Sequence, residues 1–190
     1  MTDAGSPNPL DWSPDGCCLL HQARPRTGVG SDLWLLPLQN NRPATPVFQT
    51  PFLEAQGRFS PDGRWLAYVS NESGRNEVYV RAFPSGDSKR QVSSQGGIEP
   101  MWRRDGKELF YLALDRKLMA IPVSTGSAFE AAPPVVLFET RMSILPTAAY
   151  SRNQYVVSAD GQRFLINQPR ADAPSSPITV VVNWPATLKP

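Results

Sequence analysis

Short apolar segments of three to five residues recur along the chain, and turn-forming residues separate them. Asp-Gly pairs lie next to several of these segments; Asp62-Gly63, for example, comes shortly before residues 66–68. An Asp-Gly pair flanked by apolar, aromatic-rich segments is a strong local signal for a β-hairpin. Asp can hydrogen-bond the local backbone, and Gly takes the position where a side chain would clash. The pattern therefore predicts short antiparallel strands.

The turn pattern recurs four times, with its glycines at Gly16, Gly63, Gly106 and Gly161, which are 47, 43 and 55 residues apart. The flanks agree when the glycines are superposed. Four residues before each glycine stand Trp12, Phe59, Trp102 and Val157. Apolar triplets begin three residues after each glycine, at 19–21, 66–68, 109–111 and 164–166. Agreement at so many positions indicates a true internal repeat.

Each repeat continues with further strands after its hairpin. We expect a third strand at 33–36, 78–80, 117–121 and 178–182, and a weaker fourth strand at 46–48, 90–92 and 135–138. Several of these segments are apolar at consecutive positions, which implies burial on both faces. Four antiparallel strands per repeat, stacked face to face, predict an all-β propeller of about four blades rather than an ordinary β-sandwich.

The predicted blades occupy residues 8–50, 51–95, 96–140 and 141–190 of a single propeller segment, 1–190. Aromatic residues fall at equivalent positions in different repeats, and this pattern predicts packing between blades rather than a platform for nucleic-acid bases. The residues concerned are Trp12, Phe59, Trp65, Tyr68, Trp102 and Tyr111.

Composition narrows the classes of protein further. The formal net charge is +2, from 19 Lys and Arg and 17 Asp and Glu, which argues against nucleic-acid binding through bulk charge. Twenty prolines spread along 190 residues exclude a mostly helical protein. No apolar run reaches the roughly 18 residues that span a bilayer, so we expect no membrane contact by this segment. Residues 1–9 lack the apolar core of a signal peptide.

The repeat around Ser60-Pro61-Asp62-Gly63 resembles the TolB-like propellers, which are relatives of the WD-type repeat. Residues 58–70 match best, and residues 71–80 are similar to that family's loop into its third strand. The resemblance covers nearly the whole chain and is weaker in the fourth repeat, where Ala159 stands in place of the usual Pro. Residues 158–167 and 175–184 are similar to the C-terminal end of propellers in bacterial serine/threonine protein kinases.

In those kinases the propeller follows a kinase domain and a membrane helix and lies outside the cytoplasm. The resemblance therefore implies the C-terminal part of the propeller of a receptor-type kinase, on the extracytoplasmic side. The cytoplasm is the alternative, because the chain shows no signal segment. We expect a non-catalytic recognition module for a protein, peptide or small ligand. The alternative is an accessory propeller that gates a hydrolase or peptidase whose catalytic domain is absent here.

The chain offers little for catalysis or metal binding, and we expect no enzyme activity, no metal and no cofactor. His21 is the one histidine, and no Gly-x-Ser-x-Gly segment accompanies it. The adjacent Cys17 and Cys18 lack metal-ligand spacing and are expected to be reduced strand residues. Turn structure accounts for the aspartates that precede the repeat glycines, Asp15, Asp62, Asp105 and Asp160.

One set of polar residues predicts a ligand site. Gln56, Glu99 and Gln154 stand seven residues before the repeat glycines, where each inner strand begins, and Pro9 takes that position in the first repeat. Inner strands of a propeller surround the axis, so these side chains should converge at one mouth of the central channel. They could hold a peptide or small ligand there, or only solvate the loops. Open blade faces at the ends of the segment also predict self-association.

Overall fold

The computed structural model describes residues 7–23, 31–126, 128–144 and 153–167. These residues form fifteen strands and no helix. Within that part of the chain, accordingly, no helix has the length and apolarity needed to cross a membrane. The strands form antiparallel sheets that follow one another along the sequence.

Each sheet is one blade. Blade 1 contains β1 (Asn8–Trp12), β2 (Cys18–Ala23), β3 (Asp32–Pro37) and β4 (Thr45–Pro46). Blade 2 contains β5 (Glu54–Phe59), β6 (Trp65–Ser70), β7 (Glu77–Ala82) and β8 (Lys89–Gln91). Blade 3 contains β9 (Ile98–Trp102), β10 (Glu108–Leu112), β11 (Lys117–Thr125), β12 (Phe129–Ala131) and β13 (Val135–Glu139). The described part of blade 4 contains β14 (Tyr155–Val157) and β15 (Phe164–Ile166). The third strand predicted at 178–182 lies outside the described residues.

The first two strands of every blade are joined by the predicted Asp-Gly turn. The four repeat glycines have φ between 71° and 74°, a conformation that favours glycine. In blade 2 the Asp62 carboxylate accepts hydrogen bonds from the Ser60 hydroxyl at 2.6 Å and from the Arg64 amide at 3.1 Å. Equivalent contacts recur at Asp15 and Asp160. The prediction that these aspartates build turns is confirmed.

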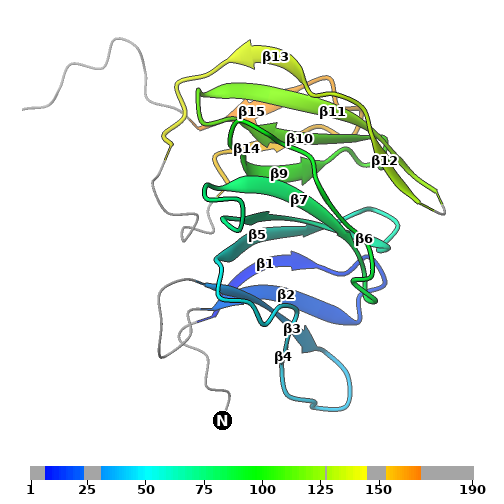
Figure 1. Cartoon of the computed structure of the whole chain (residues 1–190). Coiled ribbons are helices and arrows are strands. Elements are labelled where there is room, and N and C mark those ends of the chain that lie inside the picture. The colour runs from blue at the N-terminus through cyan, green and yellow to red at the C-terminus, as the bar shows by residue number, and fades with distance from the viewer. Residues whose placement is uncertain (1–6, 24–30, 127, 145–152, 168–190) are drawn as a thin grey trace, which may run out of the picture.

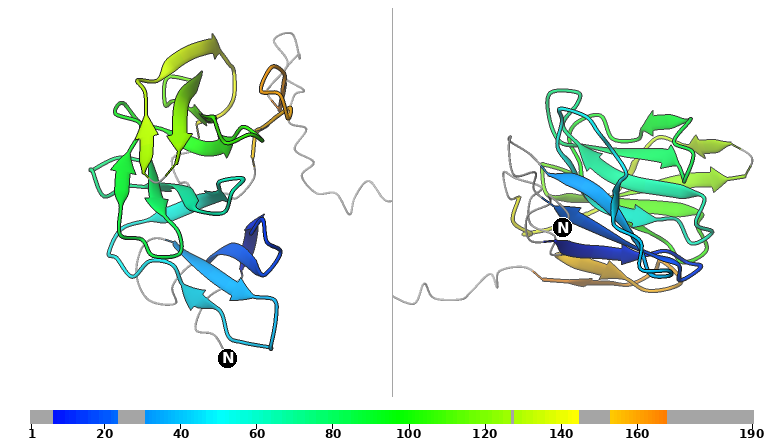
Figure 2. Two further views of the ribbon diagram at one scale, coloured as in Figure 1. Left: turned by 90° about the vertical axis from the view of Figure 1, so that its right-hand side faces the viewer. Right: turned by 90° about the horizontal axis from the view of Figure 1, so that it is seen from below.

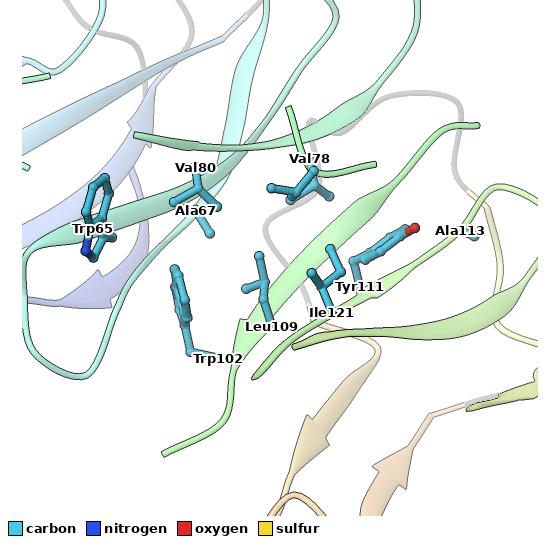
Figure 3. Close-up of a cluster of buried hydrophobic side chains, with 10 residues drawn as sticks. Trp65, Ala67, Val78, Val80, Trp102, Leu109, Tyr111, Ala113 and Ile121 are labelled. Carbon is cyan, nitrogen blue, oxygen red and sulfur yellow. The ribbon is translucent and has the colours of Figure 1, made fainter. Parts of the chain in front are cut away.

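The blades stack face to face in an arc, with blade 1 at one end and β14–β15 at the other (Figures 1 and 2). Three apolar clusters fill the junctions between successive blades. Figure 3 shows the middle one, in which Trp65 and Val80 of blade 2 face Trp102 and Leu109 of blade 3. Strand β6 is buried along its whole length, because neighbouring blades cover both its faces. The predicted all-β propeller segment is confirmed.

Two expectations about burial are wrong. Trp12 is 57% exposed, although Phe59 and Trp102 at the same repeat position are buried. The reason is that no described blade precedes blade 1. Strand β13 is exposed at all five positions despite its consecutive apolar residues, because it is the outermost strand of blade 3. An apolar run therefore indicated burial correctly for inner strands and incorrectly for this edge.

Strand β11 is longer than the sequence indicated. The sequence predicted a strand that ends at Ile121, and Pro122, which follows, cannot donate to a ladder. Pro122 nevertheless accepts a hydrogen bond from the Ala132 amide, and β11 continues and pairs with β12. The extension contacts blade 2, since the Arg64 guanidinium donates to the Thr125 carbonyl at 2.6 Å. The hairpin thus fastens blade 3 onto blade 2.

Candidate functional site

The three residues predicted at the channel mouth lie in one continuous chain of hydrogen bonds. The Glu99 amide donates to Gln56 Oε1 at 2.8 Å. The Gln154 amide donates to Glu99 Oε2 at 2.8 Å, and Gln154 Nε2 donates to Glu99 Oε1 at 2.9 Å. Each contact crosses from one blade to the next. We call this chain of contacts the mouth relay.

Blade 1 enters the mouth relay through a residue that the repeat did not indicate. The Gln56 amide donates to Oε1 of Gln22, on β2, at 3.3 Å. Pro9 holds the repeat-equivalent position on β1, and its side chain has no amide oxygen to offer. Gln22 lies opposite Asn8 in the β1–β2 ladder, one residue from Pro9, and so reaches the same place from the adjacent strand. Because Pro9 cannot supply the side-chain acceptor that Gln56 and Glu99 supply, its place in the repeat was the sequence signal that another residue of blade 1 would do so.

The backbone bends where the mouth relay is made. Gln56 and Glu99 have φ of 54° and 55°, in the left-handed region that non-glycine residues rarely adopt. The β5–β6 and β9–β10 ladders both shift register at these positions, so each residue sits in a bulge. A bulge turns the amide of its residue out of its own ladder. The amide is then free to donate to the preceding blade.

A half-buried pair of charged residues, Asp11 on β1 and Arg58 on β5, lies two residues further along the inner strands than Pro9 and Gln56. The Arg58 side chain is half-buried near Asp11 and Glu99, and its Nη1 donates to the Leu10 carbonyl. Asp11 Oδ2 accepts the Phe59 amide at 2.8 Å. Burial raises the pKa of the Asp11 carboxyl and lowers that of the Arg58 guanidinium.

Glu99 is itself a buried carboxylate, and burial raises its pKa, while the hydrogen bonds from Gln154 and the Arg58 charge act in the opposite direction. Both of its carboxylate oxygens are used by Gln154. The Gln154 amide group also exchanges hydrogen bonds with the Ser143 backbone. The structure therefore brings Gln56, Glu99 and Gln154 together, as expected, and uses their polar atoms to join blades. Ligand binding by these three residues stays a prediction.

The residues weighed for catalysis and metal binding lie apart from the mouth relay. His21 is buried on β2, and burial lowers its pKa. Within the described ranges, its Nδ1 has no hydrogen-bond partner. Cys17 and Cys18 lie beside the blade 1 turn with their sulfur atoms 3.2 Å apart and are free thiols. Among the residues that the structure describes, no three His, Cys, Asp or Glu side chains form a group that could hold a metal ion.

Sequence reasoning did not identify β13 as a surface. Val135, Val136, Leu137 and Phe138 are 37–55% exposed. Within the described residues, β13 pairs only with β11, which leaves its other edge open. A cavity of about 280 Å³ lies next to the strand, between Val136, Met119 and Tyr111, with Asp115 and Lys117 at its rim. The consecutive apolar residues of 135–138 are the sequence signal for this surface, but the same pattern also predicts an interior strand.

Comparisons with known proteins identify the fold. No family model matches the sequence, and no curated protein matches it. Among solved structures, TolB from Acinetobacter baumannii is similar with a TM-score of 0.65 and 18% identity, over 86% of this chain and 37% of that one. A putative TolB from Agrobacterium tumefaciens gives 0.55 and 17%, over 72% and 52%. A puromycin-hydrolyzing peptidase of Mycobacterium tuberculosis gives 0.58 and 20%, over 79% and 26%.

These similarities define the class of protein: the chain is a β-propeller module with a TolB-like arrangement of blades. It spans between about a quarter and a half of the length of the three structures. At such identities the likeness shows the fold alone, because propellers serve many unrelated functions.

Proposed function

We propose that the chain is a non-catalytic recognition module, and that it binds an extended segment of a partner protein along β13. The observation that carries this proposal is the exposed apolar edge of blade 3. A strand at a sheet edge presents unpaired N–H and C=O groups, to which another extended chain can add. Side chains of that chain would alternate between the two faces of the sheet.

The other blades treat their outer edges differently. Strand β4 has only two residues, and β8 is the polar triplet Lys89–Gln91. Short or charged outer strands discourage pairing with another chain. Strand β13 has five residues, four of them large and apolar. Among the outer strands of blades 1, 2 and 3, β13 is therefore the least protected against pairing with another chain. Its one protective feature is the bulge at Leu137, which interrupts the ladder with β11.

The cavity beside Val136 supplies a place for a side chain of the bound segment. Its walls are apolar at Val136, Met119 and Tyr111, and Asp115 and Lys117 form an ion pair of 2.7 Å at its rim. A volume of about 280 Å³ suits one large apolar side chain. We therefore expect an extended peptide with alternating apolar residues, one of which enters this cavity.

The parent protein belongs to this proposal too. The resemblance of residues 158–167 to kinase-associated propellers supports the sensor part of a bacterial receptor-type serine/threonine kinase, on the extracytoplasmic side. The matching residues 175–184 lie outside the described part of the chain. The similarity to the mycobacterial peptidase favours the second candidate, an accessory propeller of a peptidase. An adjoining kinase or peptidase coding sequence in the genome distinguishes the two.

Selection from a random peptide phage library tests the binding proposal. The purified chain is the bait, and enriched peptides are then synthesised and titrated by fluorescence anisotropy. Wild-type protein should enrich peptides with alternating apolar residues, and Val136→Lys should weaken their binding tenfold or more. Phe52→Lys, at a similarly exposed apolar residue away from β13, should leave binding unchanged.

Two results would overturn the proposal. One is a selection that enriches no peptide. The other is a Val136→Lys variant that binds as tightly as wild type. Turnover of peptide p-nitroanilides or of a lactone by the purified chain would overturn the non-catalytic assignment.

A further inference from the structure

The junctions between blades follow one rule, which assigns each repeat position to a face. The residues four before and three after the repeat glycine face the preceding blade. In blade 2 these are Phe59 and Leu66, which are buried against blade 1. In blade 3 they are Trp102 and Leu109, which are buried against blade 2. We call this side of a blade its back face.

Blade 1 has the same back-face residues without a described blade to cover them. Trp12 is 57% exposed. Leu19 lies directly opposite Trp12 in the β1–β2 ladder, and Leu36 lies opposite Leu19 in the β2–β3 ladder. Both leucines are only partly buried. The three side chains form an apolar row across the sheet, because residues paired across neighbouring strands share one face.

The opposite side of each blade, its front face, follows the same rule. The residue four after the glycine faces the next blade, and it is fully buried in the first three blades, at Leu20, Ala67 and Phe110. In blade 4 that position is Leu165, which is 75% exposed. Val156 lies opposite Leu165 in the β14–β15 ladder and is also exposed. Among the described residues, one end of the arc thus has no blade on its back face and the other end has none on its front face.

A directional contact shows how the two faces would fit. In the junction between blades 2 and 3, the Trp102 indole N–H donates to the Arg58 carbonyl at 3.1 Å. By repeat position, Trp12 corresponds to Trp102 and Val156 corresponds to Arg58. The back face of blade 1 could therefore pack on the front face of blade 4 as blade 3 packs on blade 2, with the Trp12 indole N–H donating to the Val156 carbonyl.

We propose that blade 1 of one copy of this chain docks onto blade 4 of a second copy. The back face of blade 1 contributes Trp12, Leu19 and Leu36, and the front face of blade 4 contributes Val156 and Leu165. Each face carries side chains at the repeat positions that form junctions within the chain, so a second copy offers a complementary surface. The contact is heterologous, because different surfaces of the two copies meet. It is separate from the peptide edge at β13.

Light scattering after size-exclusion chromatography tests the docking over a range of micromolar concentrations. Wild-type protein should show a mass above the 20.9 kDa of one chain, rising with concentration. Trp12→Ala and Leu165→Asp should each return the mass to that of one chain. Phe52→Asp, at an exposed phenylalanine that precedes blade 2 and lies outside both faces, should associate as wild type does. Circular dichroism confirms that each variant is folded.

A mixture of the two variants decides the geometry. Trp12→Ala keeps an intact blade 4 and Leu165→Asp keeps an intact blade 1, so the mixture retains one complete junction. Its mass should exceed that of either variant alone. A wild-type chain that stays monomeric at every concentration overturns the proposal. So does a mixture that stays monomeric, or an assembly that Trp12→Ala alone disrupts, since contact between two like faces would behave in that way.

Discussion

Replacing Glu54 with glutamine should remove a pH-dependent loss of stability that the wild-type protein carries. Glu54 begins β5 and is 1% exposed. Its Oε1 accepts a hydrogen bond from the Thr50 hydroxyl at 2.5 Å, whereas its buried Oε2 has no hydrogen-bond partner among the residues that the structure describes. Burial raises its pKa from 4.5 to about 7, with the Thr50 hydrogen bond opposing this and the nearby Asp32 charge adding to it. A buried carboxylate with an unpartnered oxygen costs free energy when it ionises.

The sign follows from the direction of the shift. Because the pKa is higher in the folded state than in the unfolded state, folding favours the protonated group. The stabilising contribution is full below pH 4.5, and it is lost as the pH rises through about 7. A rise from 4.5 to about 7 is worth about 3 kcal/mol at 1.4 kcal/mol per unit. Glutamine keeps the acceptor for Thr50 and cannot ionise.

Urea unfolding of both proteins, on either side of the titration, measures this difference. Between about pH 4.5 and 8.5 the wild-type free energy of unfolding should fall by about 3 kcal/mol relative to that of Glu54→Gln. Comparing the two proteins cancels the contributions of every other titrating group that the substitution leaves alone. Parallel pH profiles would refute the reasoning, because they would show that Glu54 ionises equally easily in the folded and unfolded chain.

Two further predictions concern packing and thiol chemistry in blades 1 and 2. A Cβ added at Gly57 would lie 2.6 Å from Leu20 Cδ2 and 2.9 Å from Leu33 Cδ1, so Gly57→Ala should destabilise the fold by about 1–3 kcal/mol in urea unfolding. Gly126→Ala, where an added Cβ meets nothing within 4 Å, is the matched control, and equal stabilities would contradict the expected clash. Burial, with the adjacent Cys17 thiol, raises the pKa of Cys18 to about 11. In a Cys17→Ser variant Cys18 is the only thiol, and iodoacetamide at pH 8 should alkylate it at least tenfold more slowly in folded than in urea-unfolded protein. Equal rates would show that the folded thiol ionises normally.

The sequence predicted the fold well because the features that define the repeat depend on residues close together in the chain. The Asp-Gly turn depends on residues that are neighbours in the chain, and so it is visible without tertiary information. The prediction failed where burial depends on what lies beside a blade. Trp12 and Trp102 hold the same repeat position, and the presence of a preceding blade among the described residues explains why Trp102 is buried and Trp12 exposed.

The candidate site was predictable in place but not in detail. Repeat spacing indicated that Gln56, Glu99 and Gln154 would lie together, and the hydrogen bonds between them confirm this. The spacing could not show the bulges at Gln56 and Glu99, because these depend on ladder register. It also could not show that Gln22 joins the mouth relay from a different strand, β2. Strand β13 was assigned to the interior because an edge and an inner strand share the same apolar pattern.

The mouth relay also bears on where ligands should be sought. Hydrogen bonds stabilise a buried polar side chain, and each member of the relay finds such partners in an adjacent blade. Joining blades is therefore a sufficient physical reason for polar residues at these positions, whether or not a ligand is bound. Binding surfaces are better sought where apolar side chains are exposed and no described blade or strand covers them, as at β13 and at the two ends of the arc. The peptide selection and the mixed-variant experiment both examine such places.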